Sequence, residues 1–250
     1  MAIKSWFKNI GKNTLYYPGC LTKGVLTKEF ENYKTIFNKF GIDFIMLPEE
    51  VCCGLPMLNA GYKKDARKLA KKNLELFKQK KINKIITNCP SCYHTFKDVY
   101  PELLPEWKEA RIEVEHATIT ILNQLKKRGI NLSKISDEHK EQVTYQDPCH
   151  LGRYSGIYEE PREVIERLGG KIIEMRYNRE NAICCGAGAG VKANFPELAK
   201  AIANKKVQHM PKQAEKIISP CGLCFSNLKS ATDKSEEFSS FVLRRLEGLT

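Results

Sequence analysis

Cys52-Cys53-Gly54 and Cys184-Cys185-Gly186 are two copies of one short motif, and the cysteines around them decide how the chain is organised. In each half a single cysteine precedes the motif and a Cys-x-x-Cys pair follows it. The spacing is C-x31-CC-x35-C-x2-C in the first half and C-x34-CC-x35-C-x2-C in the second. A five-point pattern that recurs this closely predicts a duplicated domain. The two copies use all ten cysteines of the chain: Cys20, Cys52, Cys53, Cys89, Cys92, Cys149, Cys184, Cys185, Cys221 and Cys224.

The residues next to the cysteines repeat as well. Pro18-Gly19-Cys20 parallels Asp147-Pro148-Cys149, and Asn88-Cys89-Pro90-Ser91-Cys92 parallels Ser219-Pro220-Cys221-Gly222-Leu223-Cys224. Residues 126–142, between the copies, are polar and contain turn-forming residues, as is typical of a linker. We therefore expect two tandem domains, residues 1–135 and 136–250.

Short apolar segments alternate with longer helical ones in both halves, which predicts a β-α-β-α-β order in each. The expected strands are residues 14–17, 42–47 and 84–87, then 142–145, 171–175 and 216–219, and the expected helices are 23–40, 62–80, 159–168 and 195–207. This order implies an α/β fold of two pseudo-symmetric, Rossmann-like parallel sheets. Each cysteine group follows the carboxyl end of a strand, where such sheets bind ligands. We therefore expect one metal site in each half.

The residue types in the motif suit a site with several metal ions. Neighbouring cysteines form a strained disulfide but can bind neighbouring irons. Gly54 and Gly186 permit a positive φ that turns both thiols inward. Zinc needs only four ligands, so five cysteines exceed its requirement, although zinc in one half, and disulfides, remain alternatives. An ordinary cubane cluster also needs four thiolates, and the residues leave open whether the fifth is a spare ligand or part of another kind of cluster.

Composition sets limits on location and partners. The 250 residues carry a net charge of +12, and residues 63–84 contain ten basic and two acidic residues. This basic run could be a solvated helix face, a surface for an acidic partner or a nucleic-acid surface, but it lacks the interleaved aromatics and motifs of the last. No apolar run is long enough to span a membrane, and residues 1–13 do not resemble a signal peptide. We expect a cytoplasmic protein that binds no nucleic acid, in a compartment where thiols stay reduced.

Several other residues are candidates for a role near the cysteines. His150 follows Cys149, and His94 lies two residues after Cys92, so either could protonate a leaving thiolate near neutral pH. His116 follows the apolar residues 112–114 and could end a fourth strand. Arg153 could pair with an anionic substrate or cluster. Each could equally be a surface or supporting residue. The glycines of residues 186–190 are better explained by a metal-binding turn than by a nucleotide loop, because cysteines occupy the turn.

The complete motif in both halves, over residues 14–230, resembles the CCG cysteine-rich domain family. Its members include the B subunit of heterodisulfide reductase, the carboxyl half of the D subunit, and iron–sulfur subunits of glycolate, glycerol-3-phosphate and lactate oxidation systems. The segment Cys184-Cys185-Gly186-Ala187-Gly188-Ala189-Gly190 is most similar to the heterodisulfide reductase members. The resemblance implies two noncubane [4Fe-4S] clusters, each held by the five cysteines of one half. It also implies a substrate disulfide split between the clusters, one sulfur on each, so that the two sites face each other.

The resemblance further implies an oxidoreductase subunit that works with partner subunits. The chain has no Cys-x2-Cys-x2-Cys-x3-Cys-Pro segment for an ordinary cluster, so we expect a ferredoxin-like iron–sulfur subunit or a flavoprotein to deliver electrons, and a small disulfide or thiol as substrate. One alternative is an electron-relay subunit of a flavoprotein complex that oxidises a 2-hydroxy acid or glycerol-3-phosphate. Another is a non-catalytic assembly or anchoring subunit with structural zinc in one half.

Overall fold

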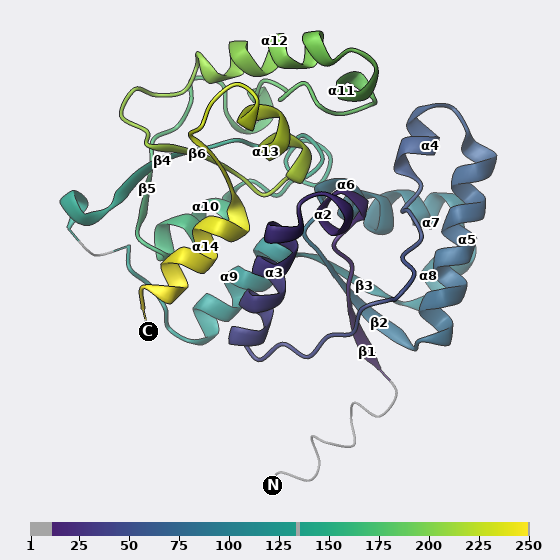
Figure 1. The fold of residues 1–250 in the computed structure, drawn as a ribbon. Coiled ribbons are helices and arrows are strands. Elements are labelled where there is room, and N and C mark those ends of the chain that lie inside the picture. The colour runs from purple at the N-terminus through teal and green to yellow at the C-terminus, as the bar shows by residue number, and fades with distance from the viewer. Residues whose placement is uncertain (1–11, 134–135, 250) are drawn as a thin grey trace, which may run out of the picture.

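A computed structural model describes residues 12–133 and 136–249 (Figure 1). The first half contains β1 (Asn13–Tyr16), α2 (Cys20–Gly24), α3 (Thr27–Lys39), α4 (Leu55–Asn59), α5 (Lys63–Gln79), β2 (Ile82–Thr87), α6 (Pro90–His94), η2 (Thr95–Val99), α7 (Tyr100–Leu103), α8 (Pro105–Ala110), β3 (Glu113–His116) and α9 (Ala117–Lys127). The second contains η3 (Asp137–His139), β4 (Glu141–Tyr145), α10 (Glu159–Arg167), β5 (Gly170–Ile172), η4 (Arg179–Asn181), α11 (Val191–Asn194), α12 (Pro196–Val207), β6 (Lys216–Ser219), α13 (Gly222–Lys229), β7 (Ser235–Glu237) and α14 (Phe238–Glu247). No helix in these ranges is long and apolar enough to cross a membrane.

The two halves contain parallel sheets with the same strand order. The first sheet is β1-β2-β3, and a single bridge from Leu15 to Ile45 extends it beyond β1. The second is β5-β4-β6-β7, with β5 in the place that Ile45 takes in the first. All the strand pairs are parallel. The predicted α/β fold of two parallel sheets is therefore confirmed.

Some predicted elements differ from the observed ones. The strand predicted over residues 42–47 is reduced to the bridge at Ile45, because only Ile45 exchanges backbone hydrogen bonds with β1, through Thr14 and Tyr16. The helix predicted over 23–40 is divided into α2 and α3 at Val25 and Leu26. β3 confirms the fourth strand that His116 was expected to end. The matching strand β7 was not predicted, because its sequence Ser-Glu-Glu is polar.

A layer of four helices lies between the two sheets and joins the halves. α9 packs on α10 and α3 packs on α14, and Figure 1 shows all four between the sheets. One apolar cluster runs through the layer and includes Tyr16 and Phe37 of the first half with Tyr145 and Phe238 of the second. Because this core is shared, the layer holds the two sheets in a fixed relative orientation.

Buried hydrogen bonds add to the contact between the halves. Tyr33 Oη on α3 donates to Glu237 Oε1 over 2.9 Å, and Asn32 Nδ2 donates to Ser240 Oγ over 3.0 Å. Glu237 also caps α14 by accepting the backbone N–H of Ser239. Burial raises the pKa of this carboxyl from 4.5 to about 7, and the hydrogen bonds from Ser239 and Tyr33 only partly oppose the shift.

Replacing Glu237 by Gln is expected to stabilise the chain at alkaline pH. A raised carboxyl pKa in the folded state gives a contribution to stability that is complete below pH 4.5 and is lost as the pH rises through about 7. Glutamine does not titrate: its amide oxygen can accept the bonds from Ser239, and its NH2 group can donate to Tyr33 Oη once that hydroxyl has turned. At 1.36 kcal/mol per pKa unit, the stability difference should shift in favour of Glu237→Gln by up to about 3 kcal/mol between about pH 4.5 and pH 8. Urea unfolding at several pH values measures it, with Glu109→Gln on the exposed face of α8 as control. A difference independent of pH would contradict the role of this carboxyl.

Candidate functional site

The two Cys-Cys-Gly turns are built in the same way. Gly54 and Gly186 adopt φ angles of +88° and +87°, a region that favours glycine. A Cβ on Gly54 would lie 3.4 Å from the carbonyl oxygen of Ala66 on α5, and one on Gly186 would lie 3.1 Å from that of Ala199 on α12. The glycine therefore serves both the turn and the close approach of the following helix. Its N–H points to the first thiol of the pair, with 3.4 Å from N to Sγ in both halves.

Five of the six remaining cysteines lie in the first turn of a helix or directly before it, and Cys149 lies in a turn after β4. Cys20 is the first residue of α2, and Cys89 and Cys221 directly precede α6 and α13. A helix N-terminus favours a thiolate. Gly19 brings the loop of Cys20 onto the Cys-x-x-Cys pair, because a Cβ there would lie 3.1 Å from Cys89 Cβ and 3.3 Å from Cys92 Sγ. Segments far apart in sequence thus meet at one end of the first sheet.

All five thiols of the first half form one chain of contacts. The order is Cys20, Cys52, Cys53, Cys92 and Cys89, and each thiol shifts the pKa of the next. The neighbouring Cys20 thiol lowers the pKa of Cys52 to about 2, whereas the Cys52 thiol raises the pKa of Cys53 to about 12. The pKa of Cys89 is lowered by Cys92, whose own pKa is raised by Cys53 and Cys89. Two of the five thiols, Cys52 and Cys89, therefore have a lowered pKa, and the other three have a raised one.

Four of the five thiols in the second half form the equivalent chain, in the order Cys184, Cys185, Cys224 and Cys221. Cys149 is separate: its Sγ lies 3.5 Å from His150 Nδ1. Burial raises the pKa of this thiol, and the nearby Cys221 and Cys185 raise it further. The structure thus brings together five predicted ligands in one half, and four with a fifth nearby in the other.

The donor set fits a thiolate-bound group of high positive charge. The mixture of raised and lowered pKa values means that the thiols do not all ionise together, because each thiolate opposes ionisation of its neighbours. A bound cation removes this conflict and keeps coordinating thiols deprotonated. Within residues 12–133 and 136–249, no three His, Cys, Asp or Glu side chains are arranged to hold a single metal ion.

Two asparagines that the sequence did not point to hold the paired cysteines in place. Asn73 Nδ2 on α5 donates to Cys52 O over 3.1 Å, and Asn227 Nδ2 on α13 donates to Cys185 O over 2.6 Å. Tyr100 Oη adds a 3.0 Å bond to Cys53 O. The two asparagines come from α5 and α13, which are not equivalent helices in the duplication. The two halves therefore hold the paired cysteines with the same kind of hydrogen bond from different helices. Their burial shows only in the structure, so no sequence pattern distinguishes them from other polar helix residues.

One position behind the turns differs in charge between the halves. Ala66 and Ala199 make the equivalent contacts to Gly54 and Gly186, and seven residues later along each helix stand Asn73 and Lys206. Lys206 is 1% exposed. Burial lowers its pKa, while the surrounding Asp147 and the cysteines of the second half oppose that shift. A neutral amide therefore backs the first cysteine group and an amine backs the second.

Two of the three predicted histidines meet where the halves join. The ring of His94 lies 5.7 Å from that of His150, and Tyr154 stacks on His150 at 4.9 Å. His94 Nδ1 is held by Asp98 Oδ2 at 2.9 Å. Burial lowers the pKa of His150, and the neighbouring His94 lowers it further. These rings connect the loop after Cys92 with the loop after Cys149.

His116 and Arg153 lie in different surroundings. His116 is fully buried at the end of β3, where its Nδ1 caps α9 through Thr118, and burial lowers its pKa to about 3. Its contacts are those of a structural cap. Arg153 Nη1 donates to Ala182 O over 2.7 Å and so ties the loop after Cys149 to the segment before Cys184.

Both cysteine groups lie near the boundary between the two halves. α2, which begins at Cys20, contacts α13, which follows Cys221. A Cβ on Gly222 would lie 2.7 Å from Leu26 Cδ1 and 3.3 Å from Leu21 Cδ2. Figure 1 shows α2 and α6 on the side of the first sheet that faces α13. With the His94–His150 contact, this places both groups along one boundary.

The cysteine-rich domain family CCG matches this chain twice, over residues 14–97 and 143–229. The chain belongs to the CCG family. This confirms the resemblance expected from the motif, and each match contains one complete set of five cysteines.

Several named relatives share most of this chain. The D subunit of the dihydromethanophenazine:CoB–CoM heterodisulfide reductase of Methanosarcina acetivorans is 39% identical over 229 residues, which cover 88% of this chain and 54% of the relative. The B subunit of a fumarate reductase (CoM/CoB) of Methanothermobacter marburgensis is 27% identical, covering 93% and 45%. An EtfAB:quinone oxidoreductase of Syntrophomonas wolfei is 32% identical, covering 80% and 28%. The CCG chain thus spans about half, or less, of the length of these relatives.

Replacing Asn227 by Ala is expected to weaken metal binding in the second half of this CCG protein and leave the fold intact. The change leaves the carbonyls of Cys185 and Ala199 without their amide donor, which costs about 1–3 kcal/mol for buried groups. Metal content per chain after anaerobic reconstitution, with circular dichroism for the fold, measures the effect. Asn73→Ala should do the same in the first half, and the exposed Asn204→Ala is the control. Full metal content in both buried variants would contradict the proposed support.

Proposed function

We propose that this CCG protein is an iron–sulfur redox subunit of a heterodisulfide-reductase-like complex, with one cluster in each half. The observation that carries the proposal is the pair of five-cysteine groups along one boundary, each with two buried thiols, in a chain 39% identical to the D subunit of a heterodisulfide reductase. Partner subunits, ferredoxin-like or flavin-containing, would complete the complex.

The ligands follow from the two thiol groups. Cys20, Cys52, Cys53, Cys89 and Cys92 would hold the first cluster, and Cys149, Cys184, Cys185, Cys221 and Cys224 the second. Clusters of this kind supply single electrons. A noncubane [4Fe-4S] form in each half is part of the proposal, and the continuous chain of five thiols in the first half supports it, because a cubane would leave one thiol unused.

Disulfide reduction would use both cysteine groups, one on each side of the boundary between the halves. Cleaving a disulfide to two thiols consumes two electrons and two protons, so one electron from each side balances the bond. The His94–His150 pair stands at the boundary between the sides and would bind and deliver the protons. His150 Nδ1 lies beside Cys149 Sγ. Because Asp98 holds Nδ1 of His94, the Nε2 atom of the His94 ring would be the one that binds and releases a proton.

A relay of electrons within a flavoprotein complex is the second candidate. The relative named EtfAB:quinone oxidoreductase favours it, since its name describes electron transfer to a quinone and no disulfide. In a relay both clusters would pass electrons without binding substrate sulfur, and the histidines at the boundary would have no proton to deliver.

Metal analysis and electron paramagnetic resonance separate these possibilities. Anaerobically prepared protein should contain about eight irons per chain, because each cluster holds four. An added thiol should change the resonance spectrum if substrate sulfur binds the clusters, whereas an unchanged spectrum favours a relay. Zinc with little iron would contradict both and favour a structural role.

Replacing Lys206 by Met should lower the reduction potential of one cluster. The change removes a buried positive charge behind the second cysteine group, and such a charge is worth on the order of 2 kcal/mol, or roughly 100 mV for one electron. Potentiometric titration of both clusters measures the shift. The exposed Lys205→Met is the matched control. Equal shifts in both clusters, or none, would show that Lys206 does not distinguish the two halves.

A further inference from the structure

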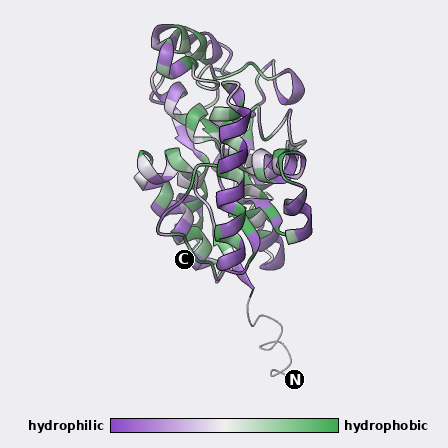
Figure 2. Ribbon diagram, turned by 90° about the vertical axis from the view of Figure 1, so that its right-hand side faces the viewer, coloured by the Kyte–Doolittle hydropathy of each residue, from purple (hydrophilic) through white to green (hydrophobic). Residues whose placement is uncertain are grey.

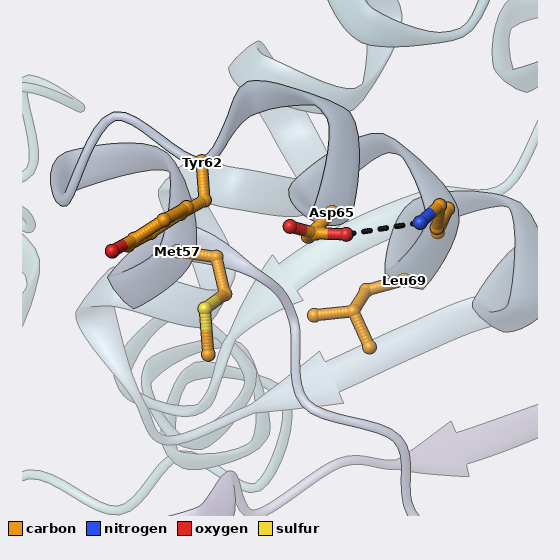
Figure 3. Close-up of a pocket in the computed structure, with 5 residues that line it drawn as sticks. Met57, Tyr62, Asp65 and Leu69 are labelled. Carbon is orange, nitrogen blue, oxygen red and sulfur yellow. Dashed lines mark hydrogen bonds and ion pairs between the residues drawn. The ribbon is translucent and has the colours of Figure 1, made fainter.

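An apolar groove lies directly against the first cysteine turn. It has a volume of about 440 Å³ and is lined by Met57, Tyr62, Asp65, Lys68 and Leu69 (Figure 3). Met57 and Tyr62 are 43% and 59% exposed, so two large apolar side chains line the same groove at the surface. Figure 3 shows both on one side of the groove and Leu69 on the other.

Leu69 connects the groove to the proposed ligands. A Cβ on Gly54 would lie 3.6 Å from Leu69 Cβ, so this leucine separates the groove from the Cys52-Cys53-Gly54 turn by one side chain. Met57 follows the same turn by three residues and lies on α4. A molecule seated in the groove would therefore be close to the first cysteine group and would make no contact with the second sheet.

The surface around the groove is strongly basic. α5 carries seven basic and two acidic residues, and Figure 2, viewed from this side, shows its outward face as mainly hydrophilic. Lys68 pairs with Asp65 over 3.1 Å at the rim. Within the described part of the chain, the other exposed cations near the groove pair with no carboxylate: Lys63, Lys64, Arg67, Lys71 and Lys72.

We propose that this groove and the basic face of α5 form the docking surface for an acidic electron-donor protein that inserts an apolar side chain between Met57, Tyr62 and Leu69. Acidic groups on the donor would match the cations of α5 and steer its approach. A second copy of this chain would bring a like-charged helix to the surface. The inference relies on the proposed redox function for the nature of the partner, while the surface itself is defined by the groove and its charges.

The second half provides a matched comparison. Phe195 directly precedes α12 as Tyr62 precedes α5, and it is equally exposed at 62%. α12, however, carries only three basic residues and one acidic residue, and the basic Lys206 is buried. Charge reversals at Lys200 and Lys205 therefore change the net charge as much as reversals on α5 do, on a helix that the proposal leaves without a partner.

Binding of a purified acidic ferredoxin tests the surface without depending on cluster loading. Carbodiimide cross-linking followed by peptide mass spectrometry should place cross-links on α5. Lys64→Glu/Lys68→Glu should weaken binding about tenfold at low ionic strength, an effect that salt reduces. Met57→Ser/Tyr62→Ser should weaken it at all salt concentrations, and Lys200→Glu/Lys205→Glu should bind normally.

Three results would overturn the proposal. Equal loss in the α12 charge variant would mean that net charge alone attracts the ferredoxin. Binding of a labelled oligonucleotide that depends on Lys64 and Lys68 but not on Met57 and Tyr62, together with no ferredoxin binding, would identify a nucleic-acid surface. Dimerisation that the Met57→Ser/Tyr62→Ser variant abolishes would identify a second copy as the occupant. Because cross-linking does not require iron, a failure of cluster loading would count against the proposed function and leave this test valid.

Discussion

The apolar layer formed by α3, α9, α10 and α14 is the constraint on which the rest of the molecule depends. A duplicated domain could place a metal site at the end of each sheet with the two sites pointing anywhere. Here the clusters of aromatic and aliphatic side chains from both halves merge into one core. Close packing of such a core permits few alternative orientations, so the two sheet ends and their cysteines are held along one boundary. The buried bond from Tyr33 to Glu237 reinforces the same orientation with a directional contact.

Burial of the thiols is the second constraint, because it limits which of them can be ionised. Cys53, Cys92, Cys185 and Cys224 are buried, and in each group two of the other three cysteines are partly buried and one is exposed. Thiolates in such surroundings need compensating positive charge. Backbone N–H groups of the turns and helix starts supply part of it, and a bound cationic group would supply the rest. The amide bonds from Asn73 and Asn227 fix the peptides of the paired cysteines, so the thiols are positioned before any metal arrives.

The sequence predicted what periodicity and cysteine spacing control, and missed what only tertiary contacts control. The strand ends next to Cys20, Cys89, Cys149 and Cys221 were predictable because apolar strands precede each one. The polar β7 was not, since its backbone pairs with β6 while its side chains carry no strand pattern. Asn73 and Lys206 look like ordinary polar residues of amphipathic helices, and their importance follows from the approach of α5 and α12 to the two glycines. The contact between His94 and His150 depends on the helical layer, which no local pattern encodes.

The differences between the halves suggest a direction for electrons. The first half carries the groove and the exposed cations of α5, where an acidic donor would arrive. The second has Lys206 behind its cysteines, where the first has Asn73. A buried positive charge stabilises the reduced form of a neighbouring centre, so an electron that enters at the first site would be drawn to the second. One substitution on the inner face of a helix can thus distinguish two copies of a domain whose ligands are the same. Under the proposed function, the cysteines would set which chemistry each half performs, and the residues behind them would set which half accepts an electron more readily.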